Sequence, residues 1–271
     1  MTARPDEGTP CWADAMFTDV ERAEALYADV LGWTFGASAA EYGNYVLARA
    51  DGSAVAAVVP PAPGQQGPAQ WCLHLASPDA AATAARVRDH GGEVLMQPMR
   101  VGDFGTMCLA REPGGAVFGV WQGDTHEGFE ATAVPGAYCW AEIRTREPER
   151  TDAFFTAVFD YTVRGIEGGM NGFRVYDLGG RTVLGRMRMT DDLPPETPSY
   201  IEVYFTVADC DAAVAAAGRH GSAVRYGPAD SPFGRWAALT DPQGARFSVI
   251  DITTARGEKP QAEDVVRAPD G

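Results

Sequence analysis

Hydrophobic and polar residues alternate along the chain with two different periods. A short apolar run at residues 12–17 predicts a strand, and residues 19–30 carry apolar side chains at every third or fourth position, which predicts a helix ending near Gly32. Further apolar stretches lie on either side of an Asp51-Gly52 turn and predict strands. The order is strand, helix and three strands, at residues 12–17, 19–30, 33–36, 45–50 and 54–59.

The same order of elements returns after a linker rich in Pro, Gly and Gln at residues 60–70. It predicts a strand, a helix and three strands at residues 70–76, 78–89, 94–96, 106–111 and 116–122. In the second half, strands are predicted near 138–144, 173–177, 181–188, 200–207, 223–225, 235–240 and 245–252, with helices near 149–159 and 209–219. The chain therefore contains four predicted modules of one helix and several strands.

The two halves of the chain repeat one another. Residues 104–122 and 233–252 both begin with Phe-Gly, turn at an acidic residue followed by Pro-x-Gly, and end in an apolar run. The sequence CWADA at 11–15 returns as CWAEI at 139–143, and the offset stays between 128 and 130 residues along the chain. An internal duplication of a two-module unit is therefore predicted.

Composition and charge narrow the possible partners. Hydrophobic residues make up 45% and charged residues 22% of the chain, which is typical of a globular protein. No apolar run approaches the roughly 18 residues of a membrane span, and the N-terminal ten residues do not suggest a signal peptide. Five cysteines without a CxxC pair indicate reduced thiols in a cytoplasmic protein. The net charge of −15 argues against nucleic acid or an anionic membrane as partner and is compatible with a small-molecule ligand.

Four βαβββ modules in two pairs resemble the vicinal oxygen chelate superfamily of glyoxalases, bleomycin-resistance proteins and extradiol dioxygenases. The resemblance covers residues 10–252 and rests on the run Tyr27-Ala-Asp-Val-Leu-Gly-Trp33 and on the Pro-x-Gly turn before each closing strand. The chain also resembles two-domain actinobacterial proteins described as glyoxalase-like. The resemblance implies an α+β fold in which two modules form a cup of eight curved strands around a ligand.

The domain boundaries follow from the modules. We expect an N-terminal glyoxalase-like domain at residues 8–124 (modules 8–60 and 69–122), a C-terminal one at 135–253 (modules 136–189 and 199–252), and a flexible tail at 254–271.

Metal-dependent members of this superfamily hold a divalent ion with side chains from the first and closing strands of the modules. The helix and turn landmarks place these positions at Trp12, Cys72, Trp140, Glu202, Gly119 and Ser248. The N-terminal half then offers Cys72 alone, and the C-terminal half offers Glu202 and a hydroxyl, which are too few donors for a divalent ion. We therefore expect no metal ion and no other cofactor. A register shift of one residue would instead bring in His74, Asp14 or Glu142.

Aromatic side chains are expected to line the cups. Trp12 and Trp140 hold the same position in the two halves, and strand alternation places a carboxylate beside each. An indole next to a carboxylate suits a flat aromatic or cationic molecule. Alternatively, the tryptophans fill the cups as core and the carboxylates lie at the rim. The expected ligand-binding residues are Trp12, Asp14, Trp121, Trp140, Glu142, Glu202 and Tyr204.

Two functions are compatible with these features. The first is metal-independent binding of a small aromatic or cationic molecule, similar to drug sequestration by bleomycin-resistance proteins. The second is a metal-free isomerase, lyase or cyclase with Glu202, Asp14 or His74 as general base, although His74 is also compatible with a core position. The sequence does not decide whether the protein is an enzyme, nor whether it is a monomer or a homodimer. We expect His126 to be solvated, and Arg186 and Arg188 to face solvent or an interface.

Overall fold

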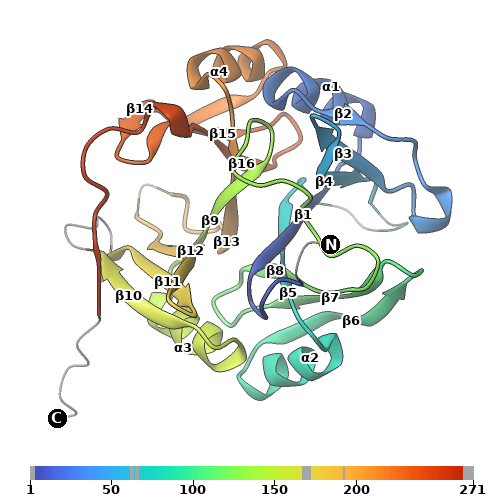
Figure 1. Cartoon of the computed structure of the whole chain (residues 1–271), viewed down its shortest axis with the longest axis vertical. Helices are drawn as coiled ribbons and strands as arrows, with labels where there is room; N and C mark the ends of the chain where they lie inside the picture. The colour runs from blue at the N-terminus through green and yellow to red at the C-terminus, as the bar shows by residue number, and fades with distance from the viewer. Residues whose placement is uncertain (1–3, 62–63, 65–66, 167–171, 192, 265–271) are drawn as a thin grey trace.

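The computed structural model describes residues 4–61, 64, 67–166, 172–191 and 193–264. It contains two sheets that lie side by side, each flanked by two helices (Figure 1). The predicted α+β fold with two glyoxalase-like halves is confirmed. None of the helices in the described ranges is long and apolar enough to cross a membrane.

The N-terminal half forms one eight-stranded sheet with the strand order β2-β3-β4-β1-β5-β8-β7-β6. The first strand of each module, β1 or β5, lies at the centre, and the two run antiparallel. The first module consists of β1 (Pro10–Met16), α1 (Val20–Leu31), β2 (Thr34–Phe35), the 3-10 helix η1 (Ala40–Tyr42), β3 (Val46–Ala50) and β4 (Ser53–Val59). The second consists of β5 (Trp71–Ala76), α2 (Ala80–Asp89), β6 (Glu93–Val101), β7 (Gly105–Arg111) and β8 (Val117–Gly123).

The C-terminal half repeats this arrangement and adds one strand, in the order β14-β15-β16-β13-β9-β12-β11-β10-β17. Its third module consists of β9 (Tyr138–Thr145), α3 (Pro148–Val158), β10 (Thr162–Ile166), β11 (Arg174–Leu178) and β12 (Arg181–Arg188). The fourth consists of β13 (Tyr200–Thr206), α4 (Cys210–Arg219), β14 (Ala223–Ser231), β15 (Gly234–Thr240) and β16 (Arg246–Asp251), followed by η3 (Ile252–Thr254). The added strand, β17 (Ala262–Asp264), pairs with β10 and lies within the segment expected to be a flexible tail.

Local sequence signals fix the ends of the helices. Asp19 and Asp79 cap α1 and α2, because their carboxylates accept hydrogen bonds from backbone N–H groups of the first turn. At the other end of α1, Gly32 adopts a φ of 71°, the left-handed conformation that glycine reaches without strain.

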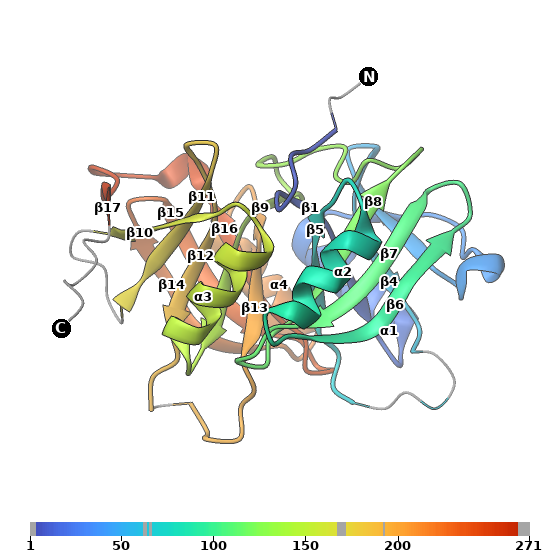
Figure 2. The same cartoon turned by 90° about the horizontal axis from the view of Figure 1, so that it is seen from below.

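A single hydrophobic core fills the space between the two sheets. Trp33 and Trp71 of the N-terminal half pack edge-on against Phe205 of β13, with ring centroids 5.3 and 5.1 Å apart. Tyr27 donates a hydrogen bond to Asp241 across the same boundary, at 3.0 Å. Helices α1 and α4 meet at one end of the molecule, and α2 and α3 meet at the other (Figures 1 and 2). The sheets therefore pack back to back, and their other faces point away from each other.

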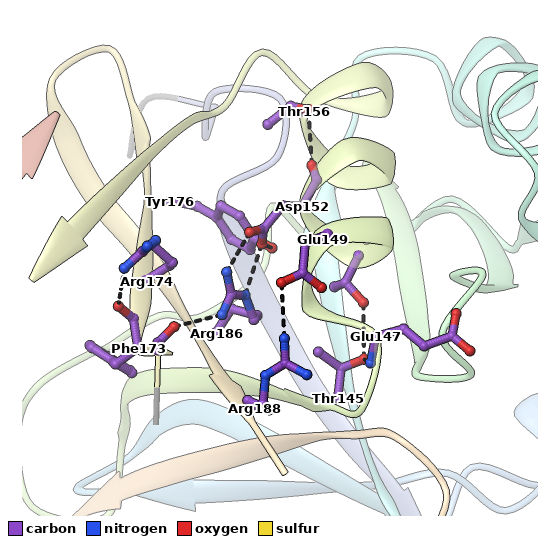
Figure 3. Close-up of polar contacts among 12 residues, drawn as sticks. Thr145, Glu147, Glu149, Asp152, Thr156, Phe173, Arg174, Tyr176, Arg186 and Arg188 are labelled. Atoms are coloured by element: carbon purple, nitrogen blue, oxygen red, sulfur yellow. Dashed lines mark hydrogen bonds and ion pairs between the residues drawn. The ribbon is translucent and has the colours of Figure 1, made fainter. Parts of the chain in front are cut away.

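Arg186 lies on the core side of its sheet, so the prediction that it faces solvent or an interface is wrong. Its side chain is buried between β12 and α3, where Nε donates to Asp152 Oδ1 at 2.9 Å (Figure 3). The Tyr176 hydroxyl donates to the same oxygen at 2.6 Å. Arg188, two residues further on, is exposed and pairs with Glu149, as expected. The ion pair with Asp152 compensates the guanidinium for the loss of water on burial.

Candidate functional site

We define the N-terminal cup as the face of the first sheet that points away from the second sheet. Its centre carries a polar cluster on β1 and β5, where Asp14 lies opposite Cys72 and Trp12 lies opposite His74. His74 Nε2 lies 3.1 Å from Asp14 Oδ2. The carboxylate, thiol and imidazole each place one donor atom within 4.8 Å of the other two. The pairing of β1 with β5 brings these side chains together on one face of the sheet, so the expectation that the N-terminal half offers only Cys72 as a donor is wrong.

Tyr45, just before β3, anchors the carboxylate of this cluster. Its hydroxyl donates to Asp14 Oδ2 at 3.0 Å and accepts from Trp12 Nε1 at 2.7 Å. Burial, together with the nearby negative charge of Asp14, raises the pKa of the Tyr45 phenol well above its usual value. Tyr45 therefore remains a neutral donor that holds Asp14 toward His74.

His74 occupies space that Gly119 leaves open on the neighbouring strand β8. The histidine is only 1% exposed, and a Cβ atom at position 119 would lie 2.0 Å from its Nδ1. Burial disfavours the charged imidazole, but the nearby negative charge of Asp14 outweighs burial, and the pKa of His74 is raised well above its usual value. Gly119 is thus required by the histidine, which explains the missing side chain at this closing-strand position.

The segment that links the two halves covers part of the N-terminal cup. The ring of His126 packs edge-on against Trp12 with centroids 4.6 Å apart, and its backbone carbonyl accepts from Trp121 Nε1 at 2.8 Å. Phe129 packs against Trp12 from the same segment. The prediction that His126 is solvated is therefore wrong, and burial lowers the pKa of its imidazole. Trp12 and Trp121 are 4% and 8% exposed, so these indoles are mostly covered.

The C-terminal cup, the corresponding face of the second sheet, is built around two facing carboxylates. Glu142 on β9 lies directly opposite Glu202 on β13. Like charges in this position repel each other, and each has an arginine partner. Arg144 Nη2 lies 2.6 Å from Glu142 Oε2, and the Arg225 guanidinium contacts Glu202 Oε1. The four charged side chains form a network without net charge.

Further hydrogen bonds involve most of the polar atoms of this network, but Arg144 Nε and one oxygen of Glu202 have no partner among the described residues. Tyr204 donates to Glu142 Oε2 at 3.1 Å, and Trp140 Nε1 approaches Glu142 Oε1 at 3.3 Å. Ser248 donates to Glu202 Oε1 at 2.8 Å. The second oxygen, Oε2 of Glu202, is buried and has no hydrogen-bond partner among the described residues. A buried carboxylate oxygen without a donor is unfavourable and can accept a hydrogen bond from a ligand.

An aromatic wall leads from this carboxylate to solvent. Trp236 on β15 packs against Tyr204 at 5.9 Å and stacks on Tyr226 of β14 at 4.9 Å between ring centroids. Tyr226 is 54% exposed, whereas Trp140 and Trp236 are half-buried. The C-terminal cup therefore presents aromatic surface to solvent.

The structure distributes the predicted site residues over both cups. Trp12, Asp14, His74 and Trp121 lie in the N-terminal cup, and Trp140, Glu142, Glu202 and Tyr204 lie in the C-terminal cup. Sequence reasoning missed the residues Tyr45, Arg144, Arg225, Tyr226 and Trp236. Strand alternation from Glu142 would have placed Arg144 on the same face of β9. Arg225 and Tyr226 could not be placed in this way, because register shifts interrupt the alternation of β14.

The C-terminal cup does not fit the divalent ion that metal-dependent members of the superfamily hold. Glu202 stands at one expected ligand position, but Arg225 already supplies a positive charge to its carboxylate. Ser248, at the closing-strand position, donates its proton to the same carboxylate. A guanidinium at this place repels a second cation.

Comparison with known proteins identifies the class. The Glyoxalase/Bleomycin resistance protein/Dioxygenase superfamily model matches residues 12–120. The 2,3-dioxygenase LapB from Pseudomonas sp. KL28 superposes with a TM-score of 0.62 at 12% identity, covering 94% of both chains. The Mn(II)-bound glyoxalase from Novosphingobium aromaticivorans superposes with a TM-score of 0.61 at 17% identity, covering 93% of this chain and 87% of that one. At such identities these structures show the fold alone.

Two relatives are more similar in sequence. CFP32 of Mycobacterium tuberculosis, whose name marks it as a candidate glyoxylase, is 37% identical over 251 residues, covering 90% of this chain and 95% of CFP32. The anthracycline biosynthesis protein DnrV of Streptomyces peucetius is 36% identical over 263 residues, covering 90% of this chain and 94% of DnrV. The chain therefore belongs to the Glyoxalase/Bleomycin resistance protein/Dioxygenase superfamily, and the resemblance found in the sequence is confirmed.

Proposed function

We propose that the C-terminal cup binds a small planar aromatic molecule and that this binding needs no metal ion. The observation that carries the proposal is Glu202 Oε2, a buried acceptor without a donor beside an aromatic wall. A hydroxyl or N–H group at the edge of a flat ligand would satisfy this oxygen, while its ring would lie against Trp236 and Trp140.

The charge of the cup supports an aromatic ligand over a strongly cationic one. Two carboxylates and two guanidiniums balance each other, so the cup offers no excess negative charge to a cation. Arg225 neutralises Glu202 where metal-dependent members would hold their ion, which supports metal-independent binding.

The relatives point to the same ligand class. The names of DnrV and of DauV from Streptomyces sp. strain C5 place both in anthracycline biosynthesis, and anthracyclines are fused-ring aromatic compounds. We propose binding of the sequestering kind, in which the protein holds the compound without converting it. The five free cysteines fit a reducing compartment such as the cytoplasm.

A binding titration tests the proposal. Fused-ring phenols and quinones are added to the protein in buffer with EDTA, and quenching of tryptophan fluorescence is measured. Replacing Trp236 with Leu should weaken binding by roughly tenfold or more, because a stacked aromatic contact contributes about 1–3 kcal/mol. The matched control is Met107→Leu, which changes the equivalent position of the N-terminal cup and should leave the affinity unchanged. Binding that appears only after a divalent ion is restored, or equal losses in both variants, would refute the proposal.

A second candidate function is catalysis without a metal, in which Glu202 accepts a proton from the bound compound. The unpaired Oε2 atom favours this function, since a general base needs a lone pair that no other donor occupies. Any compound that binds is incubated with the protein and analysed by mass spectrometry. A product that forms with the wild type and is lost in Glu202→Gln would show catalysis, and an unchanged compound would leave sequestration as the function.

A further inference from the structure

We propose that Cys72 is a nucleophilic thiol that forms a covalent bond with a conjugated carbonyl compound, an enone or a quinone, in the N-terminal cup. This site is separate from the C-terminal cup and therefore goes beyond the proposed function.

The geometry is that of a thiol, an imidazole and a carboxylate in one cluster. Cys72 is half-buried, so it is within reach of a ligand, and one donor atom each of Cys72, His74 and Asp14 lies within 4.8 Å of the other two. His74 is 1% exposed, and neither ring nitrogen has a hydrogen-bond partner of good geometry among the described residues. Its Nε2 lies 3.1 Å from Asp14 Oδ2, which is the distance of an ion pair. An imidazole that a carboxylate holds beside a thiol is the arrangement that activates cysteine nucleophiles.

The surroundings keep the imidazole in its charged form. Asp14 faces it from β1, and Tyr45 holds that carboxylate in place. A charged His126, in the linker, would repel a positive charge on His74. Burial lowers the pKa of His126, however, and so favours its neutral form. Burial lowers the pKa of His74, but the negative charge of Asp14 outweighs burial and raises it. An imidazolium next to a thiol favours the thiolate, which is the reactive form.

The other four cysteines lie in different surroundings from Cys72. Cys11, Cys108 and Cys210 are buried, and burial raises the pKa of each thiol. Cys139 is half-buried like Cys72, but burial around its sulfur raises its pKa to about 11. Among the described residues, Cys72 is the cysteine that lies in a cluster with a histidine and a carboxylate.

The reaction with a conjugated carbonyl compound balances without an oxidant or reductant. The Cys72 thiolate attacks the β-carbon, and a C–S bond forms as the carbon–carbon π bond breaks. The electron pair moves to the carbonyl oxygen, and the resulting enolate takes a proton from the His74 imidazolium. His74 becomes neutral. The product is a thioether in which the Cys72 sulfur is bonded to the former β-carbon of the compound. Trp12 and Trp121 lie in the same cup, but both indoles are mostly covered, so recognition of the compound rests on the thiol, the imidazole and the carboxylate.

Competition between the five thiols tests the proposal. The native protein is treated with substoichiometric iodoacetamide or 1,4-naphthoquinone, and modified peptides are quantified by mass spectrometry. We expect Cys72 to react about tenfold or more faster than Cys139, the other half-buried thiol, and Cys72→Ser to abolish the quinone adduct. Equal rates for the two cysteines would refute the proposal.

Two variants separate activation from mere exposure. His74→Gln should slow the modification of Cys72 about fivefold or more, because an unassisted thiol is only a few per cent thiolate at neutral pH, while the rate of Cys139 stays constant. If His74→Gln fails to fold, Asp14→Asn provides the same comparison. In either variant, a loss of thiolate absorbance in the ultraviolet would report that Cys72 is less ionised. An unaltered rate in a folded variant would overturn the proposal. Stoichiometric protection of Cys72 by zinc in the purified protein would also overturn it, since the thiol would then be a metal ligand.

Discussion

Gly119 makes the position of His74 possible, and replacing this glycine with alanine should destabilise the protein. The new Cβ atom would lie 2.0 Å from Nδ1 and 2.5 Å from Cγ and Cε1 of His74, whereas ordinary van der Waals contact begins at 3.4 Å. The imidazole is buried and paired with Asp14, so it can move away only by giving up that pair.

The expected cost follows from these two effects. Overpacking a filled site costs about 1–3 kcal/mol, and separating a buried ion pair costs about 3 kcal/mol or more. The two costs do not add, because His74 escapes the clash only by moving away from Asp14. We therefore expect Gly119→Ala to lower the free energy of unfolding by about 3 kcal/mol. In a His74→Ala background the added methyl group has space, and the same substitution should stabilise the strand by about 0.5–1 kcal/mol.

Urea unfolding of the four proteins in this double-mutant cycle measures the coupling between the two positions. Gly218→Ala is the control, because Gly218 lies in α4 with nothing within 4 Å of its Cβ direction, and alanine there should be neutral or stabilising. If Gly119→Ala costs the same with and without the histidine, the steric explanation of Gly119 is wrong.

Three further predictions concern the buried polar groups. Arg186→Met should lower the free energy of unfolding by about 3 kcal/mol or more in urea titrations, because it leaves Asp152 without its guanidinium partner. Adding Asp152→Leu should recover most of this loss. The stability that His74 contributes should be complete below about pH 6.5 and should be lost as the pH rises through its raised folded-state pKa. The wild type should therefore lose more stability than His74→Gln between neutral and alkaline pH, and parallel pH curves would contradict this. Tyr27→Phe should lower the free energy of unfolding by about 1–3 kcal/mol in urea titrations, since it removes the donor to Asp241 Oδ2, whereas Oδ1 keeps its backbone donors; an unchanged midpoint would contradict this.

The hydrophobic pattern was sufficient to predict most elements of the fold, because strands with one face on the core alternate clearly. It failed for β10, whose residues Thr162–Ile166 are exposed or only half-buried and include a glycine and an arginine. That strand is held mainly by backbone pairing to β11 and β17, and Val163 is the residue of β10 that packs against the core. Strand β14 was predicted too short, because its pairing with β15 continues through register shifts around Gly227 and Pro228, residues that normally end a strand.

Alternation also placed the central site residues on the correct sheet face, since a period of two is fixed once one residue is assigned. It could not show which side chains meet across strands that are distant in sequence. Tyr45 reaches Asp14 over 31 positions, and Arg225 reaches Glu202 over 23. Gly119 was interpreted from the sequence only as a missing side chain, because the space it leaves for His74 depends on the pairing of β5 with β8.

The duplicated positions show how the two cups acquired different chemistry from one layout. Asp14 and Glu142 are equivalent, as are His74 and Tyr204, and in both cups the acid lies 3.1 Å from its partner on the neighbouring strand. The next equivalent pair differs, with Cys72 in one cup and Glu202 in the other. A second carboxylate facing the first is stable only with added positive charge, which Arg144 and Arg225 provide. The thiol needs no such compensation, so the N-terminal cup keeps its imidazole beside the thiol, whereas the C-terminal cup uses its arginines to neutralise its two carboxylates.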